Sequence, residues 1–233
     1  MQFIYRWTFR MSTAKKGQMG TAQRREREKT ELRTRILDAA RAIVRREGFG
    51  ALTVRKIADA IEYAPGTLYL YFENRDAIAR ELSSEGFLKL LEAFAPAERI
   101  ADPLARLEAI GRAYVQFGME NAETYRLIFM EDPQLTTAVF EGAGGDPGQR
   151  AYRALIDPLE ELQQAGRLHP GADVQALADT LWSVVHGIVS LKLTCPGFPV
   201  TPVEPLLDTA LRTFLDGLVR PAPPATSSES GAV

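Results

Sequence analysis

The sequence has almost none of the residues that form disulfides and metal sites. Its 233 residues include one cysteine, Cys195, so a disulfide within the chain cannot form. The two histidines, His169 and His186, do not have the short spacing of a Cys/His metal cluster. We therefore expect no metal and no cofactor, and a reducing, cytoplasmic location.

Long apolar segments are also missing. No uninterrupted apolar run reaches the roughly 18 residues that a membrane-spanning helix requires, so we expect no membrane partner. The opening segment MQFIYRWTFR contains Arg6 and Arg10 and leads to no small-residue cleavage site, which argues against a targeting signal. Because Met11 and Met19 are alternative translation starts to Met1, we interpret the first residues as an artefact of the start or as a disordered arm.

The common motifs of catalysis are absent from the sequence as well. It contains no nucleophile elbow, no Glu-x-x-His metal pattern and no glycine-rich phosphate loop. Acidic pairs such as Glu160-Glu161 are typical of a solvated helix surface. We therefore expect that the protein is not an enzyme, and keep a helical enzyme only as the weaker alternative.

Charge is distributed unevenly along the chain. Residues 1–90 carry 18 Lys and Arg against 11 Asp and Glu, whereas residues 91–233 carry 10 against 19. The first part is therefore basic and the rest acidic, although the whole chain has a formal net charge of only −2. This division favours one region that meets a polyanion and a second region that does not.

Apolar residues recur at helical spacing over most of the chain, and no stretch alternates convincingly at period two. The pattern predicts an all-α protein with about nine helices. Thr53, Asn74 and Asp102 are candidate N-caps, and Pro65 suits a first helical turn. We expect helices near 27–46, 53–61, 65–72, 74–90, 103–121, 123–130, 149–165, 173–192 and 202–219.

This pattern divides the chain into four regions. We expect a disordered or basic arm over 1–26, a DNA-binding domain over 27–75, a larger helical domain over 76–220 and a disordered tail over 221–233. The segment EGAGGDPG near residue 145 is rich in glycine, which is typical of a flexible loop.

The segment LTVRKIADAIEYAPGTLYLYF, residues 52–72, contains two short helical patterns separated by a break. Two short helices joined by a tight turn, with a longer helix before them and basic residues around them, are typical of a helix-turn-helix. In that motif the second helix lies in the major groove of DNA, and here we expect it to be held by a small core of Ile57, Ala58, Ile61 and Leu68.

The stretch from Gly48 to Ile78 resembles the tetracycline-repressor (TetR) type of bacterial transcriptional regulator, through its Thr53, the pair Ile-Ala, the segment GTLYLYF and Arg75. The resemblance implies that Thr53, Tyr69 and Arg75 contact phosphates, and that Arg55, Ala64, Pro65, Gly66 and Thr67 lie close to the bases. Two positions depart from the common pattern. Glu62 replaces the usual turn glycine, and Ala64 replaces the usual capping Ser or Thr.

Three further residues are candidates for DNA contact on their own chemistry. Tyr71 has a hydroxyl that can reach a phosphate while its ring packs. Arg24 and Arg25 precede the first expected helix, where an arm can follow the DNA backbone or enter the minor groove.

The acidic region contains TLWSVVHGIVSL, residues 180–191, which resembles the Trp-His-Gly signature of one C-terminal class within the TetR type. The resemblance implies that this domain binds a small molecule and forms a dimer. His186 is either a hydrogen-bonded core histidine or a pocket residue. Tyr114, Phe117, Tyr125 and Phe129 have spacings that suit a core or the wall of an apolar cavity near Trp182 and His186.

The last two expected helices predict a four-helix dimer interface. One carries a stripe of small residues that includes Gly187 beside a stripe of larger apolar ones, Leu177, Leu181, Val184, Ile188 and Leu191. The final helix offers Leu206, Leu207, Ala210, Leu211, Phe214 and Leu215. The favoured function is a homodimeric repressor released from a near-palindromic operator by a hydrophobic or aromatic effector, and a DNA-binding regulator without an effector is the main alternative.

Overall fold

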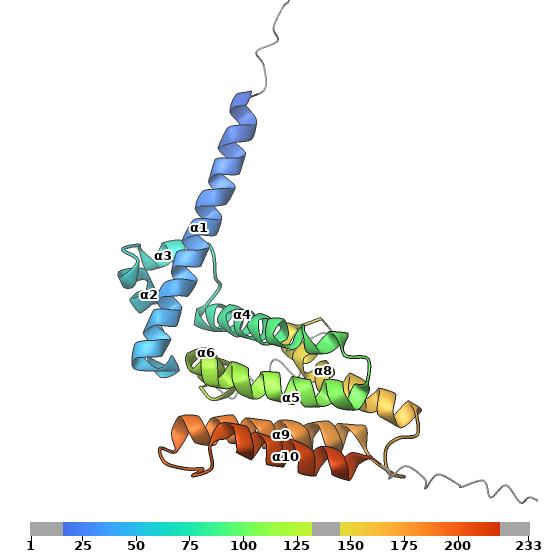
Figure 1. The fold of residues 1–233 in the computed structure, drawn as a ribbon. Coiled ribbons are helices and arrows are strands. Elements are labelled where there is room, and N and C mark those ends of the chain that lie inside the picture. Colours follow the sequence, from blue (N-terminus) through green and yellow to red (C-terminus); the bar gives the residue numbers. More distant parts are fainter. Residues whose placement is uncertain (1–15, 132–144, 220–233) are drawn as a thin grey trace, which may run out of the picture. The chain divides into compact units, whose positions relative to one another are not determined.

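The computed structural model describes residues 16–131 and 145–219, and Figure 1 shows helices joined by loops over these ranges. These ranges contain nine α-helices, two short 3₁₀ helices and no β-strand beyond one isolated bridge between Leu168 and Val219. The predicted all-α fold is thereby confirmed. The arm residues 1–15, part of the glycine-rich loop and the tail from residue 220 lie outside the described residues.

The chain forms two compact units that divide between Ile78 and Ala79. The first unit contains α1 (Lys16–Glu47), α2 (Val54–Ala60) and α3 (Pro65–Leu68), and the first turn of α4 (Arg75–Phe94). Its predicted small core is confirmed, because Ile57, Ala58, Ile61 and Leu68 are all buried. They lie with the apolar face of α1 and with Phe49, Leu52 and Phe72.

Helix α1 begins much earlier than the sequence suggested. We expected an arm up to residue 26, but α1 is already helical at Lys16. The residues between are mostly good helix formers, and Arg24 and Glu28 form an ion pair one turn apart at 2.7 Å. Every residue from Gly20 to Glu31 is nevertheless exposed, so this part of the helix has no core beneath it.

The second unit contains the rest of α4 and the helices α5 (Pro103–Glu120), α6 (Ala122–Phe129), α8 (Pro147–Gln164), α9 (Val174–Thr194) and α10 (Val203–Leu218). Asp102, Asp146 and Asp173 cap α5, α8 and α9 by accepting backbone N–H groups. Helices α5, α8 and α9 contact one another, and α10 contacts α5 and α9, so one apolar core lies between them.

Gly118 allows α5 to lie close to α9. A Cβ at this position would approach Val189 Cγ1 to 2.5 Å and Tyr125 Cδ2 to 3.0 Å, which is closer than real side chains approach. The glycine therefore sets the distance between the two helices and brings α9 within reach of the aromatic residues of α5 and α6.

Within the described ranges, α9 is the one helix whose length and composition would allow it to cross a membrane, with a mean hydropathy of 1.2 over its most apolar window. Its apolar residues Leu181, Val185 and Val189 are buried in the core of the second unit. The same test is passed by the core helices of many soluble proteins, and Asp179 and Lys192 interrupt the apolar run.

Candidate DNA interface and effector site

The turn between α2 and α3 contains a strained residue. Glu62 has a φ of 61°, the left-handed region that favours glycine, and it is the one non-glycine residue with positive φ in the described ranges. This is the position at which the sequence lacks the usual turn glycine. The strain is tolerated because neighbouring contacts fix the turn, including the bond from Tyr63 N–H to the Ala58 carbonyl at 2.9 Å.

Arg35 of α1 braces this turn. Its guanidinium donates to the carbonyl of Ile61 at 3.1 Å and lies over the ring of Tyr63, 5.2 Å from its centroid. Tyr63 therefore packs against Arg35 of α1 at this turn. Its contact with Arg35 compensates in part for the missing turn glycine.

Helix α3 is shorter than expected. Its regular part ends at Leu68, and the chain continues to Phe72 in turns closed by bonds such as Tyr71 N–H to Leu68 O at 2.9 Å. Ala64 caps the helix without a side-chain hydrogen bond, as its missing hydroxyl predicts, and Pro65 occupies the first turn. Arg33 of α1 holds the far end through a bond to the Tyr71 carbonyl.

The segment after α3 alternates between core and solvent. Leu68 and Phe72 are buried, whereas Tyr69 and Leu70 are 56% and 78% exposed. Leu70 was not a predicted contact residue, yet it is the most exposed large apolar side chain among the described residues of the first unit. Most of the predicted DNA-contact residues are likewise exposed; Thr67, Tyr71 and Arg75 are half-buried, and the exposed ones are Arg24, Arg25, Thr53, Arg55, Ala64, Pro65, Gly66 and Tyr69.

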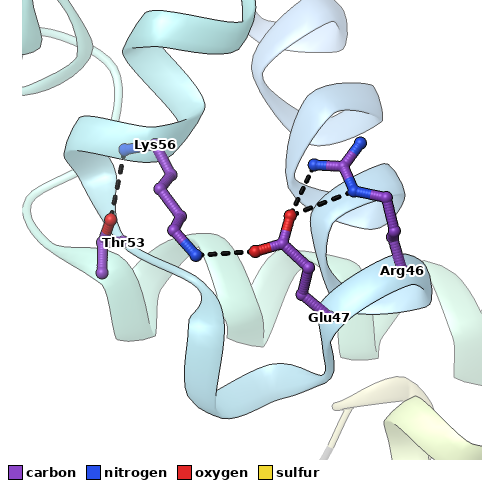
Figure 2. Close-up of polar contacts among 4 residues, drawn as sticks. All are labelled: Arg46, Glu47, Thr53 and Lys56. Atoms are coloured by element: carbon purple, nitrogen blue, oxygen red, sulfur yellow. Dashed lines mark hydrogen bonds and ion pairs between the residues drawn. The ribbon is translucent and has the colours of Figure 1, made fainter.

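The start of α2 is ordered by two polar contacts, which Figure 2 shows. Thr53 Oγ1 accepts the backbone N–H of Lys56 at 3.1 Å, so its own hydroxyl hydrogen remains able to donate. The Nζ of Lys56 lies 2.7 Å from Glu47 Oε2, so this ammonium group is already paired within the unit. Hydrogen bonds from Lys56 and then Arg46 hold the pKa of Glu47 below its ordinary value.

Arg75, at the start of α4, is held by two neighbours. Its guanidinium lies over Phe49, 4.8 Å from the ring centroid, and its Nε contacts Asp76 Oδ1 at 3.1 Å. Asn74 caps the helix, as predicted, by accepting from Ala77 N–H at 2.8 Å. The side chain of Arg75 is therefore oriented before any partner arrives.

Five of the six predicted pocket residues form one aromatic cluster in the second unit. Phe129 of α6 lies at its centre, with ring centroids of Tyr114, Tyr125, Trp182 and His186 at 4.9 to 6.1 Å. Phe87 of α4 completes the cluster, at 5.4 Å from Phe129 and nearly perpendicular to it. The sixth predicted residue, Phe117, instead lines a separate open groove between α4 and α5.

A chain of hydrogen bonds runs through this cluster. Trp182 Nε1–H donates to the Tyr114 hydroxyl at 3.1 Å, and the hydroxyls of Tyr114 and Tyr125 are 3.0 Å apart. The hydroxyl oxygen of Tyr125 lies 2.6 Å from His186 Nδ1. Each tyrosine has one hydrogen to donate, so the arrangement is satisfied when Tyr114 donates to Tyr125, Tyr125 donates to Nδ1, and the ring hydrogen of His186 is on Nε2.

Burial sets the protonation states in this chain. It raises the pKa of the Tyr114 and Tyr125 hydroxyls above their ordinary value, so both remain donors. It lowers the pKa of His186, so the imidazole is neutral near pH 7 and Nδ1 can accept. The cluster is therefore uncharged and fully hydrogen-bonded along its chain.

A small cavity lies beside the cluster. It has room for about 30 Å³, which is the volume of roughly one water molecule, and most of its walls are apolar. Tyr114, Phe129 and Trp182 line it, together with residues that were not predicted as site residues: Phe87, Leu90, Phe94, Gly148, Ala151, Tyr152 and Leu155. Tyr152 was not singled out because a lone tyrosine in a polar helix carries no distinguishing pattern.

The predicted dimer stripes are only partly on the surface. Leu181, Ile188, Leu207, Leu211 and Leu215 are buried within the unit itself, which corrects their assignment to an interface between subunits. Leu177 and Val184 of α9 do line an open groove with Leu206, Ala210 and Phe214 of α10. A Cβ at Gly187 would meet no atom within 4 Å, so nothing in the described chain requires a glycine there.

The tight turn, the propped short helix and the exposed polar residues around it define a helix-turn-helix DNA-binding protein with a separate helical domain. Comparison with protein families agrees in both parts. Residues 36–82 match the bacterial regulatory proteins of the tetR family, and residues 107–214 match a tetracyclin repressor-like C-terminal domain. The chain belongs to the TetR family of transcriptional regulators.

Individual relatives support this assignment. The HTH-type transcriptional repressor KstR2 of Mycobacterium tuberculosis is 29% identical over 178 residues, which cover 72% of this chain and 84% of the relative. The solved structure of that ketosteroid regulator matches with a TM-score of 0.56 at 21% identity, over 81% and 95% of the two chains. The structure of FadR of Bacillus subtilis in complex with stearoyl-CoA matches with a TM-score of 0.64 at 19% identity, over 79% of this chain and 98% of that one. At such identities the likeness concerns the fold alone.

Proposed function

We propose that this regulator is a cytoplasmic homodimeric repressor, released from a near-palindromic operator by a small, mainly apolar effector. The observation that carries the effector part is the aromatic cluster, because it combines an apolar cavity with a buried chain of hydrogen-bonding groups. Such a combination suits a hydrophobic or aromatic molecule with one polar group. Relatives that are repressors by name support the direction of control.

On DNA, we assign phosphate contacts to Thr53, Tyr69 and Arg75, and base contacts to Arg55 and the 64–67 segment. Thr53 keeps a free donor hydrogen and Tyr69 is largely exposed, so both are able to reach a phosphate oxygen. A dimer presents two such surfaces, so the half-sites should lie about 34–36 Å apart. The open apolar groove between α9 and α10 favours this face as the contact between subunits.

The cavity in its present form is too small for an effector, since ligand pockets typically hold about 300–1,000 Å³. Binding would therefore have to separate the rings of the cluster. Phe87 forms one wall and belongs to α4, which begins at Arg75 among the residues assigned to DNA. A ligand that displaces Phe87 shifts α4 and so favours a conformation with lower DNA affinity.

The effector assignment is tested by one substitution at two aromatic positions. Phe129→Leu removes a ring from the centre of the cluster, whereas Phe117→Leu makes the same change in the groove outside it. The operator is first recovered by selection of bound DNA fragments and sequencing. Release is then titrated with ketosteroids and fatty acyl-CoA thioesters, because two of the similar structures are connected with these molecules.

We expect Phe129→Leu to raise the half-release concentration roughly twofold to twelvefold, from about 0.5–1.5 kcal/mol of ring contact, and Phe117→Leu to leave it unchanged. Equal effects at the two positions would place the effector elsewhere. If no compound of either class releases the DNA while binding to the operator is normal, the alternative of a regulator without an effector gains support.

A further inference from the structure

The exposed first half of α1 has a surface that the helix-turn-helix does not account for. Between Gly20 and Glu31 no residue is buried, although the chain is helical over this whole length. A helix with no core beneath it is marginal in water, because tertiary contacts supply most of the stability of helices in proteins. A partner bound along this segment would supply the contacts that the domain does not provide.

The two faces of the segment differ in charge. Residues seven apart share a helix face, so Arg25 and Lys29 lie on the same face as Leu32 and Ile36, the residues by which α1 packs onto the domain. The buried face of α1 therefore continues beyond the domain as a basic face. Neither Arg25 nor Lys29 has a recorded ion pair within the described part of the chain.

The opposite face is mixed in charge. It carries Arg24, Arg27 and Glu31, and Arg24 is paired at 2.7 Å with Glu28, which lies at one border of the basic face. Glu26 lies at the other border of that face. The charge asymmetry thus runs across the helix rather than along it, and such asymmetry is what a polyanion on one side would select.

The basic face points toward the side of the domain where α3 ends. Arg33, one turn after Lys29, donates to the carbonyl of Tyr71 at 3.4 Å and lies over the ring of Phe72, 4.4 Å from its centroid. The line from Arg25 through Lys29 to Arg33 therefore leads to the residues next to the exposed Tyr69 and Leu70.

We propose that the extension of α1 over residues 20–31 is a second DNA-binding element, which remains helical and places Arg25 and Lys29 on the phosphate backbone beside the site of α3. It assigns the backbone contact to Arg25 and Lys29 rather than to Arg24. The inference rests on DNA binding by the helix-turn-helix. The extension adds affinity for DNA without sequence preference, because phosphate contacts position a protein but do not read bases.

The test compares two double variants that remove the same charge from the same segment, Arg25→Ala/Lys29→Ala and Arg24→Ala/Arg27→Ala. Alanine is the best helix former, so both keep the helix. Binding is measured by salt titration on the selected operator and on a mixed-sequence duplex. We expect the first variant to reduce the magnitude of the salt slope by about 2 for each bound subunit, or about 4 for the proposed dimer, on both DNAs, and the second to change it little.

Equal slopes for the two variants, whether both reduced or both unchanged, would overturn the proposal, because the first result reflects net charge alone and the second excludes the contact. DNA binding by the wild-type protein distinguishes a failure of this proposal from a failure of the proposed function. If wild-type protein shows no preference for the selected operator over the mixed duplex, the proposed repressor function fails instead. Thermal unfolding of both variants checks that the domain itself is intact.

Discussion

In the first unit the candidate contact residues, apart from Arg24 and Arg25, come from one stretch of about two dozen residues, Thr53 to Arg75, and most are exposed. In the second unit the candidate effector residues come from helices α5, α6 and α9, are largely enclosed, and include a hydrogen bond between residues 68 positions apart, Tyr114 and Trp182. A surface that reads DNA can be built locally. A cavity cannot, since several helices must enclose it.

The largest expected effect breaks the local unit at its small core. Leu68→Ala removes a fully buried side chain that supports α3, and should cost about 2–5 kcal/mol of folding free energy and abolish operator binding at elevated temperature. Leu70→Ala makes the same change two residues later, where the side chain is 78% exposed, and should cost within about 0.5 kcal/mol. Chemical denaturation followed by circular dichroism measures both.

Similar losses at Leu68 and Leu70 would contradict the alternation of core and solvent after α3. A Leu70→Ala variant of normal stability but weaker DNA binding would instead identify Leu70 as a contact residue, which its exposure allows.

The second unit should lose more stability when volume is added to its core than when its chain of hydrogen bonds is changed. Gly118→Ala should destabilise it by about 1–3 kcal/mol, because the new Cβ would lie 2.5 Å from Val189 Cγ1. Gly187→Ala, on α9, meets no atom within 4 Å and should be neutral or stabilising by up to about 1 kcal/mol. Thermal unfolding of the two variants gives the comparison, and a loss at Gly187 alone would reverse our assignment of the two positions.

Gly187 also tests the proposed dimer. Gly187→Leu should leave the fold of each subunit intact, because the site is open in the chain itself, but should shift the protein toward monomers in sedimentation experiments. Operator affinity would then fall, since both half-sites must be bound together. A stable dimer with native affinity would remove Gly187 from the interface.

The same comparison of the two units explains which features the sequence could predict. The caps at Thr53, Asn74 and Asp102 and the four core residues of the helix-turn-helix were read correctly, because each depends on near neighbours in sequence. The strained turn at Glu62 was visible as a missing glycine. The start of α1 at Lys16 was not predicted, because a charged sequence with no core beneath it resembles a disordered arm.

In the second unit the sequence could not separate Phe117 from Phe129. Both recur at helical spacing, and only the packing of α4, α8 and α9 decides that Phe129 meets the cluster while Phe117 lines another groove. The same reason explains the dimer stripes. Leu181 and Val184 both belong to an apolar α9, and which one is buried depends on α5 and α8.

A smaller effect should appear at the DNA surface. Arg75→Ala removes a charged contact, so the magnitude of the salt slope should fall by about 1 for each bound subunit, or about 2 for the proposed dimer, whereas Tyr69→Phe removes a neutral hydroxyl and should leave the slope unchanged. Both should weaken operator and unrelated DNA alike, Tyr69→Phe by about 0.5–1.5 kcal/mol. A selective loss on the operator would mean that the residue reads bases.

The smallest expected effect concerns pH and the histidine end of the hydrogen-bond chain. Burial lowers the pKa of His186 in the folded protein below its unfolded value near 6.5. Below about pH 6.5 the unfolded state therefore binds more protons than the folded state, so the free energy of unfolding decreases as the pH falls through this window and is unaffected above it. The tyrosine hydroxyls that face His186 do not titrate in this range, because their pKa values are raised.

His186→Gln keeps an acceptor for Tyr125 but has no titrating group, so its stability should fall less than that of the wild type between pH 7 and 5. His169→Gln, at an exposed histidine, should follow the wild type. Unfolding free energies at several pH values measure the difference, and identical pH profiles for His186→Gln and the wild type would show that the imidazole is protonated in the fold without cost, which the enclosed, uncharged cluster does not allow.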